Sequence, residues 1–203
     1  MEEFVGKVGQ LVEITWLGRG GQGAVTAAEL LAIAAIEEGK TAVAIPEFGA
    51  ERRGAPVRAY NRLSNQKKEL PKTPIVSPDI LVIIDPSLIS RAGNYINFER
   101  IRYLVANTSV TREDLAKLLG IKMPLENIFP VDGAKIAMQI FGRPIYNTVM
   151  LGALVGSVPL VKATSLESAV KKNFSGKLVE MNLKAIFEGM NKVREVEKEG
   201  IKV

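Results

Sequence analysis

A strand-like stretch that runs directly into a glycine-rich loop constrains the fold of this 203-residue chain more than any other feature. Residues 12–17 (VEITWL) are rich in β-branched and aromatic side chains, which is typical of a strand. Glycines then dominate Gly18 to Gly23. Residues 24–38 are rich in alanine, which favours a helix and is small enough for close approach to a sheet. The sequence therefore predicts a strand, a tight loop and a helix packed on a sheet.

A second strand is predicted soon after this helix. Gly39 ends the helix, and Thr41 to Ile45 form a short apolar run that ends at Pro46. Residues 12–45 thus predict one strand–helix–strand unit. A right-handed crossover that joins two paired, parallel strands is the expected geometry of such a unit.

Later segments predict the rest of an α/β domain. Residues 57–63 alternate apolar and polar side chains, which indicates a strand with one more polar face, at an edge or in a mixed sheet. Apolar runs predict further strands, and capping residues or helical spacing predict further helices. The strands are expected at 79–85, 103–106 and 128–131, and the helices at 111–119, 133–141, 147–155 and 179–193. Residues 1–203 are expected to form a single α/β domain, a three-layer Rossmann-like fold with a mostly parallel sheet.

The chain has no cysteine and no histidine. Without cysteine it has no thiolate for an iron–sulfur cluster, no disulfide and no thiol nucleophile. Without histidine it lacks the commonest zinc ligand and the commonest base near neutral pH. We therefore expect no metal site and no catalytic residue in this chain. Any part in catalysis would use backbone amides, charged side chains or hydroxyls, or would complete a site on another chain.

The charge of the chain argues against nucleic acid as a partner. The formal net charge is +5, but the basic residues are spread along the chain and only 6% of residues are aromatic. The sequence lacks the clustered basic face with stacking side chains that binds nucleic acid. A local concentration at Arg52, Arg53, Arg58 and Arg62 fits a small anionic ligand better.

No segment of the sequence indicates a membrane or an export signal. There is no apolar run of about 18 residues, and the N-terminus lacks a basic segment before an apolar one. We expect a cytoplasmic protein with no membrane partner.

The glycine loop matches the spacing of dinucleotide-binding sites. Gly18, Gly20 and Gly23 give G-x-G-x-x-G, in which backbone N–H groups and a helix N-terminus approach a phosphate. Glu47 follows the second strand, where an acidic residue binds ribose in such sites. Binding of NAD is therefore one interpretation of this loop.

Other residues in the loop are less typical of NAD binding. Gly21 adds a fourth glycine and Gln22 adds a side-chain amide, so the loop offers more hydrogen-bonding groups than NAD binding needs. Arg19 adds a cation. Phosphate binding of another kind is a second interpretation. A third is that the glycines only permit a tight turn from strand to helix.

A second basic cluster lies in the loop 46–56. If the strands before both loops are neighbours, both loops leave the sheet at the edge where open α/β sheets bind ligands. Arg19, Arg52 and Arg53 would then converge. Guanidinium groups pair with phosphate in a bidentate way, so the cluster suits a polyphosphate such as coenzyme A. Alternatively, this is an ordinary surface loop in which Glu51 neutralises one arginine.

Three stretches carry a resemblance to a known family. Residues 18–28 (GRGGQGAVTAA), 51–56 (ERRGAP), and Asn147 with 151–154 (LGAL) resemble the gamma subunit of 2-oxoacid:ferredoxin oxidoreductases, most closely of pyruvate:ferredoxin oxidoreductase. The similarity runs from about Val12 to Met190. Two long motifs in the same order and at the expected separation are more specific than G-x-G-x-x-G alone.

The resemblance implies a subunit of a larger enzyme of anaerobic metabolism. That enzyme converts pyruvate and coenzyme A to acetyl-CoA and CO2 and passes electrons to ferredoxin. Thiamine diphosphate, Mg and the iron–sulfur clusters are bound by other subunits of the family. This chain would bind no cofactor alone, would share coenzyme A with its partners, and would assemble with alpha, beta and delta subunits.

The resemblance also assigns roles to residues. The phosphate-facing loop would consist of Gly18, Arg19, Gly20, Gly21, Gln22 and Gly23, with Arg19 as a charge donor. Arg52 and Arg53 would bind phosphate or contact a partner subunit. Glu51, Gly54 and Asn147 would support the loops or lie at a subunit interface, with Asn147 expected to cap the helix that follows it. The alternatives are a stand-alone NAD-dependent oxidoreductase and a purely structural subunit.

Overall fold

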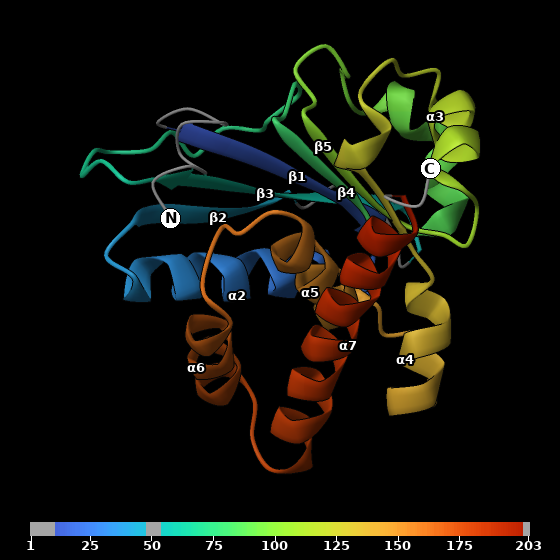
Figure 1. The fold of residues 1–203 in the computed structure, drawn as a ribbon. Helices are drawn as coiled ribbons and strands as arrows, with labels where there is room; N and C mark the ends of the chain where they lie inside the picture. The colour runs from blue at the N-terminus through green and yellow to red at the C-terminus, as the bar shows by residue number, and fades with distance from the viewer. Residues whose placement is uncertain (1–10, 48–53, 201–203) are drawn as a thin grey trace.

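The computed structural model describes residues 11–47 and 54–200, and Figure 1 shows a sheet with helices on both sides. The strand order of the six-stranded sheet is β2-β3-β1-β4-β5-β6. The strands are β1 (Leu11–Arg19), β2 (Thr41–Glu47), β3 (Pro56–Ser64), β4 (Ile80–Ile83), β5 (Tyr103–Asn107) and β6 (Ile128–Val131). The α-helices are α2 (Ala24–Glu37), α3 (Arg112–Leu119), α4 (Gly133–Phe141), α5 (Asn147–Ser157), α6 (Ala163–Asn173) and α7 (Lys177–Gly200), and the 3-10 helices are η1 (Pro86–Asn94) and η2 (Leu125–Asn127).

The sheet is mostly parallel, as the sequence predicts, but one predicted pairing is wrong. Strands β1, β4, β5 and β6 pair in parallel, whereas β3 is antiparallel to both of its neighbours, β1 and β2. The unit 12–45 therefore contains two strands of the same direction that do not touch, because β3 lies between them. Residues 57–63 belong to a mixed sheet, and they occupy an interior position, not an edge.

The other predicted elements agree with the structure to within a few residues. Thr111 caps α3 by accepting a hydrogen bond from the backbone N–H of Asp114, at 3.1 Å. Strand β2 continues through Pro46, which a strand at the edge of a sheet tolerates because its missing N–H need not face a neighbour. Three elements were not predicted, α6 and the 3-10 helices η1 and η2.

The sheet is buried on both faces, which confirms the three-layer architecture. Along β4, Ile80 and Val82 belong to the core under α2, α5 and α7, whereas Leu81 and Ile83 belong to the core under η1 and α3. In Figure 1 these two sets of helices lie on opposite sides of the sheet. This alternation on a continuous apolar run is typical of a central strand in an α/β sheet.

Helices α5 and α7 touch backbone to backbone. A Cβ on Gly152 would overlap the carbonyl oxygen of Ile186, and a Cβ on Gly189 would overlap the carbonyl oxygen of Val149. Glycine at both positions is therefore required for the observed distance between the helices. Next to this contact the hydroxyl of Thr148 donates a buried hydrogen bond of 2.9 Å to Asn182.

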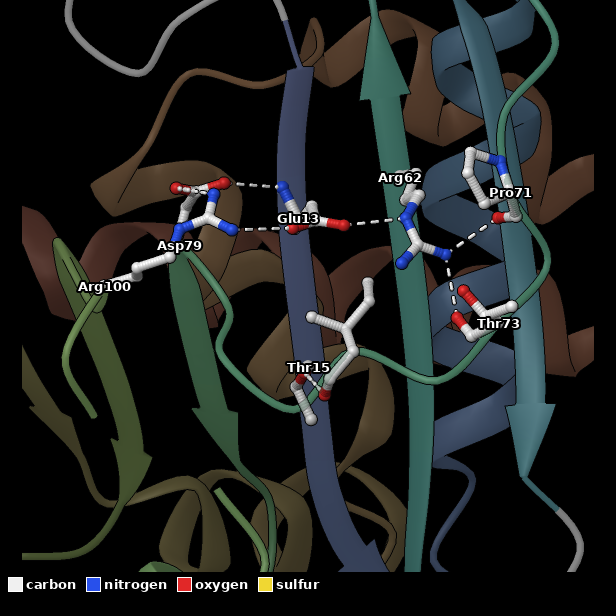
Figure 2. A network of polar contacts seen from close by, with 8 residues as sticks. Glu13, Thr15, Arg62, Pro71, Thr73, Asp79 and Arg100 are labelled. Atoms are coloured by element: carbon white, nitrogen blue, oxygen red, sulfur yellow. Dashed lines mark hydrogen bonds and ion pairs between the residues drawn. The ribbon is translucent and has the colours of Figure 1, made fainter. Parts of the chain in front are cut away.

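The polar face of β3 is buried, not wet. Arg62 is 6% exposed. Its guanidinium bonds the Glu13 carboxylate at 2.7 Å and the carbonyl oxygens of Pro71 and Thr73 at 2.7 and 2.8 Å. Figure 2 shows that these contacts hold Pro71 and Thr73 of the 65–79 segment against Arg62 of β3. Arg100 adds a second ion pair with Glu13, at 3.2 Å.

No helix in the described ranges is both long enough and apolar enough to cross a membrane.

We expect Gly152→Ala to destabilise the chain by roughly 1–3 kcal/mol, because the new methyl group would force α5 and α7 apart. Urea unfolding followed by circular dichroism measures this loss. Gly93→Ala is the control, since a Cβ there would meet only ordinary contacts with the Phe98 ring at 3.6 Å. Equal stability of the two variants would contradict the close contact.

We further expect the two arginines that share Glu13 to differ sharply. Arg62→Ala should cost about 3–5 kcal/mol because it leaves the carbonyl oxygens of Pro71 and Thr73 and one oxygen of the partly buried Glu13 carboxylate without their donor. Arg100→Ala should cost less than about 1 kcal/mol, since the Arg100 side chain is 54% exposed. Urea unfolding at low and high salt compares the two, and similar losses would show that the 65–79 segment does not depend on Arg62.

Candidate functional site

The glycine loop turns from the carboxyl end of β1 into α2. Gly21 and Gly23 have φ angles of 91° and 79°, a backbone conformation that glycine adopts without strain. Gly23 is the N-cap of α2 and offers no side chain to the first helical turn. The loop therefore presents backbone N–H groups at the positive end of a 14-residue helix.

Arg19 ties this loop to two other connections. Its guanidinium donates hydrogen bonds to the Ser87 hydroxyl at 2.8 and 3.1 Å and to the carbonyl oxygen of Gly54 at 2.9 Å. The Asp85 carboxylate lies 3.5 Å from its Nε. The positive charge of Arg19 is thus balanced by Asp85, and its side chain acts as an anchor between loops.

Gln22 closes the loop on itself. Its side-chain oxygen accepts a hydrogen bond from the backbone N–H of Arg19 at 2.8 Å, and its amide nitrogen donates to the Asp85 carboxylate. Burial opposes the ionisation of Asp85, but hydrogen bonds from Ser87 and Gln22 outweigh it and hold the pKa of Asp85 below its usual value. The loop is therefore pre-organised around an ionised carboxylate.

The C-terminal end of the loop 46–56 contacts the glycine loop. The backbone N–H of Gly20 donates to the carbonyl oxygen of Ala55 at 2.9 Å, beside the contact of Arg19 with Gly54. The two loops adjoin because β3 begins opposite the end of β1, where Pro56 pairs with Arg19. Glu51, Arg52 and Arg53 lie outside the described residues.

Glu47 does not occupy the place of a ribose-binding acid. Its carboxylate pairs with Arg58 at 2.7 Å and accepts a hydrogen bond from the Tyr60 hydroxyl. Burial, together with this hydrogen bond, raises the pKa of Tyr60. Because β3 separates β2 from β1, Glu47 also lies one strand further from the glycine loop than in a dinucleotide site. These observations argue against the NAD interpretation.

Asn147 does not form the predicted cap. The N-cap of α5 is Tyr146, no side chain caps this helix, and Asn147 is its first residue. Instead Asn147 packs on Gly23, where a Cβ would lie 2.5 Å from the Asn147 Nδ2. The N-termini of α2 and α5 therefore meet at these two residues.

Asp85 and Ser87 are site residues that the sequence analysis did not single out. Asp85 directly follows the apolar run 80–84, so it stands at the carboxyl edge of a central strand. That position was the available signal, since side chains at this edge face the ligand-binding side of α/β sheets. Ser87 has no comparable signal in the sequence.

The described part of the chain holds no group of three or more acidic residues placed to bind a metal. The fold and the site define a Rossmann-like α/β domain with a glycine-rich loop between β1 and α2, in which Arg19 and Asp85 hold neighbouring loops together.

Comparison with known proteins places this domain in a family. The family model for pyruvate ferredoxin/flavodoxin oxidoreductase matches residues 13–192. The common gamma subunit of the pyruvate/ketoisovalerate oxidoreductases of Thermococcus kodakarensis is 43% identical over 182 residues, which cover 90% of this chain and 97% of that protein. The pyruvate synthase subunit PorC of Methanothermobacter marburgensis is 40% identical, with coverage of 86% and 93%.

A solved structure supports the same family assignment. The crystal structure of the pyruvate oxidoreductase subunit PORC from Thermotoga maritima has a TM-score of 0.76 and 36% identity, and the match covers 90% of this chain and 97% of that one. The chain therefore belongs to the pyruvate ferredoxin/flavodoxin oxidoreductase family. Within that family it is a gamma-type subunit of a multi-subunit oxidoreductase.

Asp85→Asn should flatten the acid side of the stability profile. The pKa of Asp85 is lower in the folded chain than in the unfolded one, so its contribution is fully present above the unfolded value of about 3.9 and is lost as the pH falls through the folded value. At pH 7 the substitution should cost roughly 1.5–3 kcal/mol through lost charge-assisted hydrogen bonds. Urea unfolding between pH 7 and pH 3 measures both effects. An unchanged pH dependence in the variant would show that Asp85 does not hold the loops.

Proposed function

We propose that this chain helps to hold coenzyme A at the glycine loop within a pyruvate:ferredoxin oxidoreductase. The observation that carries the proposal is the direct contact between the glycine loop and the end of the arginine-bearing loop. The backbone N–H of Gly20 donates to Ala55 and the Arg19 guanidinium donates to Gly54, and in the sequence these two residues directly follow Arg52 and Arg53. Guanidinium groups and the backbone amides at a helix start are both groups that suit the phosphates of coenzyme A.

The chemistry of the reaction belongs to the partner subunits in this proposal. Thiamine diphosphate, Mg and the iron–sulfur clusters sit in the alpha, beta and delta subunits, and ferredoxin accepts the electrons. The absence of cysteine and histidine in this chain supports that division, because it has no thiolate or imidazole for a cluster or a metal. This chain would act as one cytoplasmic domain, and its contribution would be to bind and orient the coenzyme A that takes up the acyl group.

The names of the relatives also bear on the 2-oxo acid. The protein of Thermococcus kodakarensis is named as a gamma subunit common to pyruvate and ketoisovalerate oxidoreductases. A subunit shared by two such enzymes has no need to recognise the 2-oxo acid. Coenzyme A is the reactant that both enzymes would have in common, which favours it as the ligand of this chain. Pyruvate remains the proposed oxo acid.

We expect Arg52→Ala and Arg53→Ala, tested in the native complex, each to weaken coenzyme A binding about tenfold or more, since each removes a charge-assisted contact to phosphate. The loss should shrink at high salt. Isothermal titration of the purified complex measures the affinity, and gel filtration measures assembly.

Lys67→Ala is the matched control, because Lys67 follows the opposite end of β3 and is exposed. If coenzyme A binds the arginine variants normally while the complex falls apart, these arginines contact partner subunits and the chain is a scaffold.

A further inference from the structure

The two edges of the sheet differ in how the described part of the chain covers them. Strand β6 forms one edge, and its residues are almost all buried because α3 and α7 pack against it. Strand β2 forms the other edge, and every one of its residues is partly or fully exposed. Among the described residues, no strand pairs with the outer side of β2 (Figure 1). An uncovered edge of this kind is a template for pairing with another strand.

The direction of the backbone along β2 shows which groups face outward. The side-chain amide of Asn61 on β3 donates to the carbonyl oxygen of Val43 at 3.2 Å, so the backbone of Val43 faces β3. Backbone groups alternate in direction along an antiparallel strand, so those of Ala42, Ala44 and Pro46 point away from β3. Pro46 has no N–H and ends this row of donors. The edge therefore offers a short row of donors and acceptors that suits one short strand.

The side chains of this edge are uncharged over residues 41–45 (TAVAI). Successive side chains point to opposite faces of the sheet, and Val43 and Ile45 lie on the face away from α2, where neither belongs to a described core. Exposed edges are usually protected by charged residues or proline, and here Pro46 stands only at the far end of the run. The edge is therefore neutral along the length where a second strand would pair.

Helix α2 extends this neutral face beside the strand. Ile33 is partly exposed and Ile36 is 55% exposed, and with Glu29 they form one stripe at i, i+4 and i+7. Helix α2 packs on β2 and β3, whereas its neighbour α5 packs on β5 and β6, so the outer side of α2 is the side of the β2 edge. Large apolar side chains that are exposed next to each other mark a site of association.

We propose that the β2 edge and the outer stripe of α2 form the interface between two copies of this chain, related by a two-fold axis at the middle of β2. Antiparallel pairing of β2 with its copy continues the sheet and places the neutral residues 41–45 against one another, as a self-complementary interface requires. Since each α2 lies over β2 and β3, the two α2 helices stand about two strand spacings, or about 10 Å, apart, which is a normal packing distance. This interface does not depend on the coenzyme A function proposed above.

Glu29 gives the interface a salt dependence. It lies near the middle of α2, so the two-fold axis brings two copies of this carboxylate toward each other. Their repulsion opposes association and is screened by salt. The dimer should therefore tighten at high salt, and Glu29→Gln should tighten it at low salt and remove most of this dependence. Weaker association at high salt would contradict pairing of the chain with itself.

Sedimentation equilibrium of the full chain tests the interface. We expect a dimer, and Ile36→Lys should raise its Kd about tenfold or more, because it places a charge in the apolar contact. Leu118→Lys is the matched control, since Leu118 is 53% exposed on α3, on the opposite face of the sheet, and its Kd should not change. Ala44→Pro removes an outward N–H and should also raise the Kd, with little change in Tm because β3 does not use that donor.

Hydrogen exchange locates the contact. The amides of Ala42 and Ala44 should exchange more slowly as the concentration of the chain rises. A chain that stays monomeric would overturn the proposal, and so would a dimer that Ile36→Lys leaves unchanged, even if Ala44→Pro lowers the Tm. Slow exchange at every concentration would assign the edge to another segment of the same chain, and slow exchange only in the complex would assign it to a different subunit. Either result would also overturn pairing between two copies.

Discussion

The insertion of β3 between β1 and β2 is the constraint on which the candidate site depends. Antiparallel pairing places Pro56 opposite Arg19 and so brings Gly54 and Ala55 against the glycine loop. Had β1 and β2 paired directly, the acid at the end of β2 would stand beside the glycines, as in a dinucleotide site. The inserted strand places the end of an arginine-bearing loop there instead of that acid, so the glycine loop has different neighbours from those of a dinucleotide site.

The charge of Arg19 in the glycine loop is balanced by Asp85. Asp85 is held ionised at the end of β4 by Gln22 and Ser87 and is balanced by Arg19. An ion pair of this kind adds little net field, but its hydrogen bonds fix the direction of each loop. The side chains of Arg19 and Gln22 are therefore engaged within the protein, where they join the glycine loop to Gly54 and to Asp85.

The sequence contained enough information for the fold class but not for the order of the strands. Hydrophobic runs and caps are local signals, so the strand at 79–85 and the cap at Thr111 could be predicted from neighbouring residues. Pairing partners are set by contacts between distant segments, and nothing local in 57–63 indicates that this strand separates two others. The buried state of Arg62 has the same origin, because its partners lie on the 65–79 segment and on β1.

The candidate site was predictable to a similar degree. The glycine spacing located the loop, and the carboxyl-edge rule located the side of the sheet. The packing of Asn147 on Gly23 could not be inferred, because an asparagine before an apolar helix is typical of a cap. Only the meeting of α2 and α5 shows that its side chain turns toward Gly23 instead. Such a contact depends on the angle between two helices that are more than a hundred residues apart in the sequence.

The position of Asn147 in turn depends on the packing of α5 on α7. Gly189 of α7 lies against the carbonyl oxygen of Val149, which belongs to the first turn of α5, two residues after Asn147. Gly152 makes the reciprocal contact one turn further along, and the Thr148 hydroxyl bonds to Asn182 from the same turn as Asn147. These contacts fix the start of α5 along its axis and about it, because backbone atoms in contact cannot shift without overlap. Since Asn147 is the first residue of that helix, the glycine contacts with α7 also set where its side chain meets Gly23 at the start of α2.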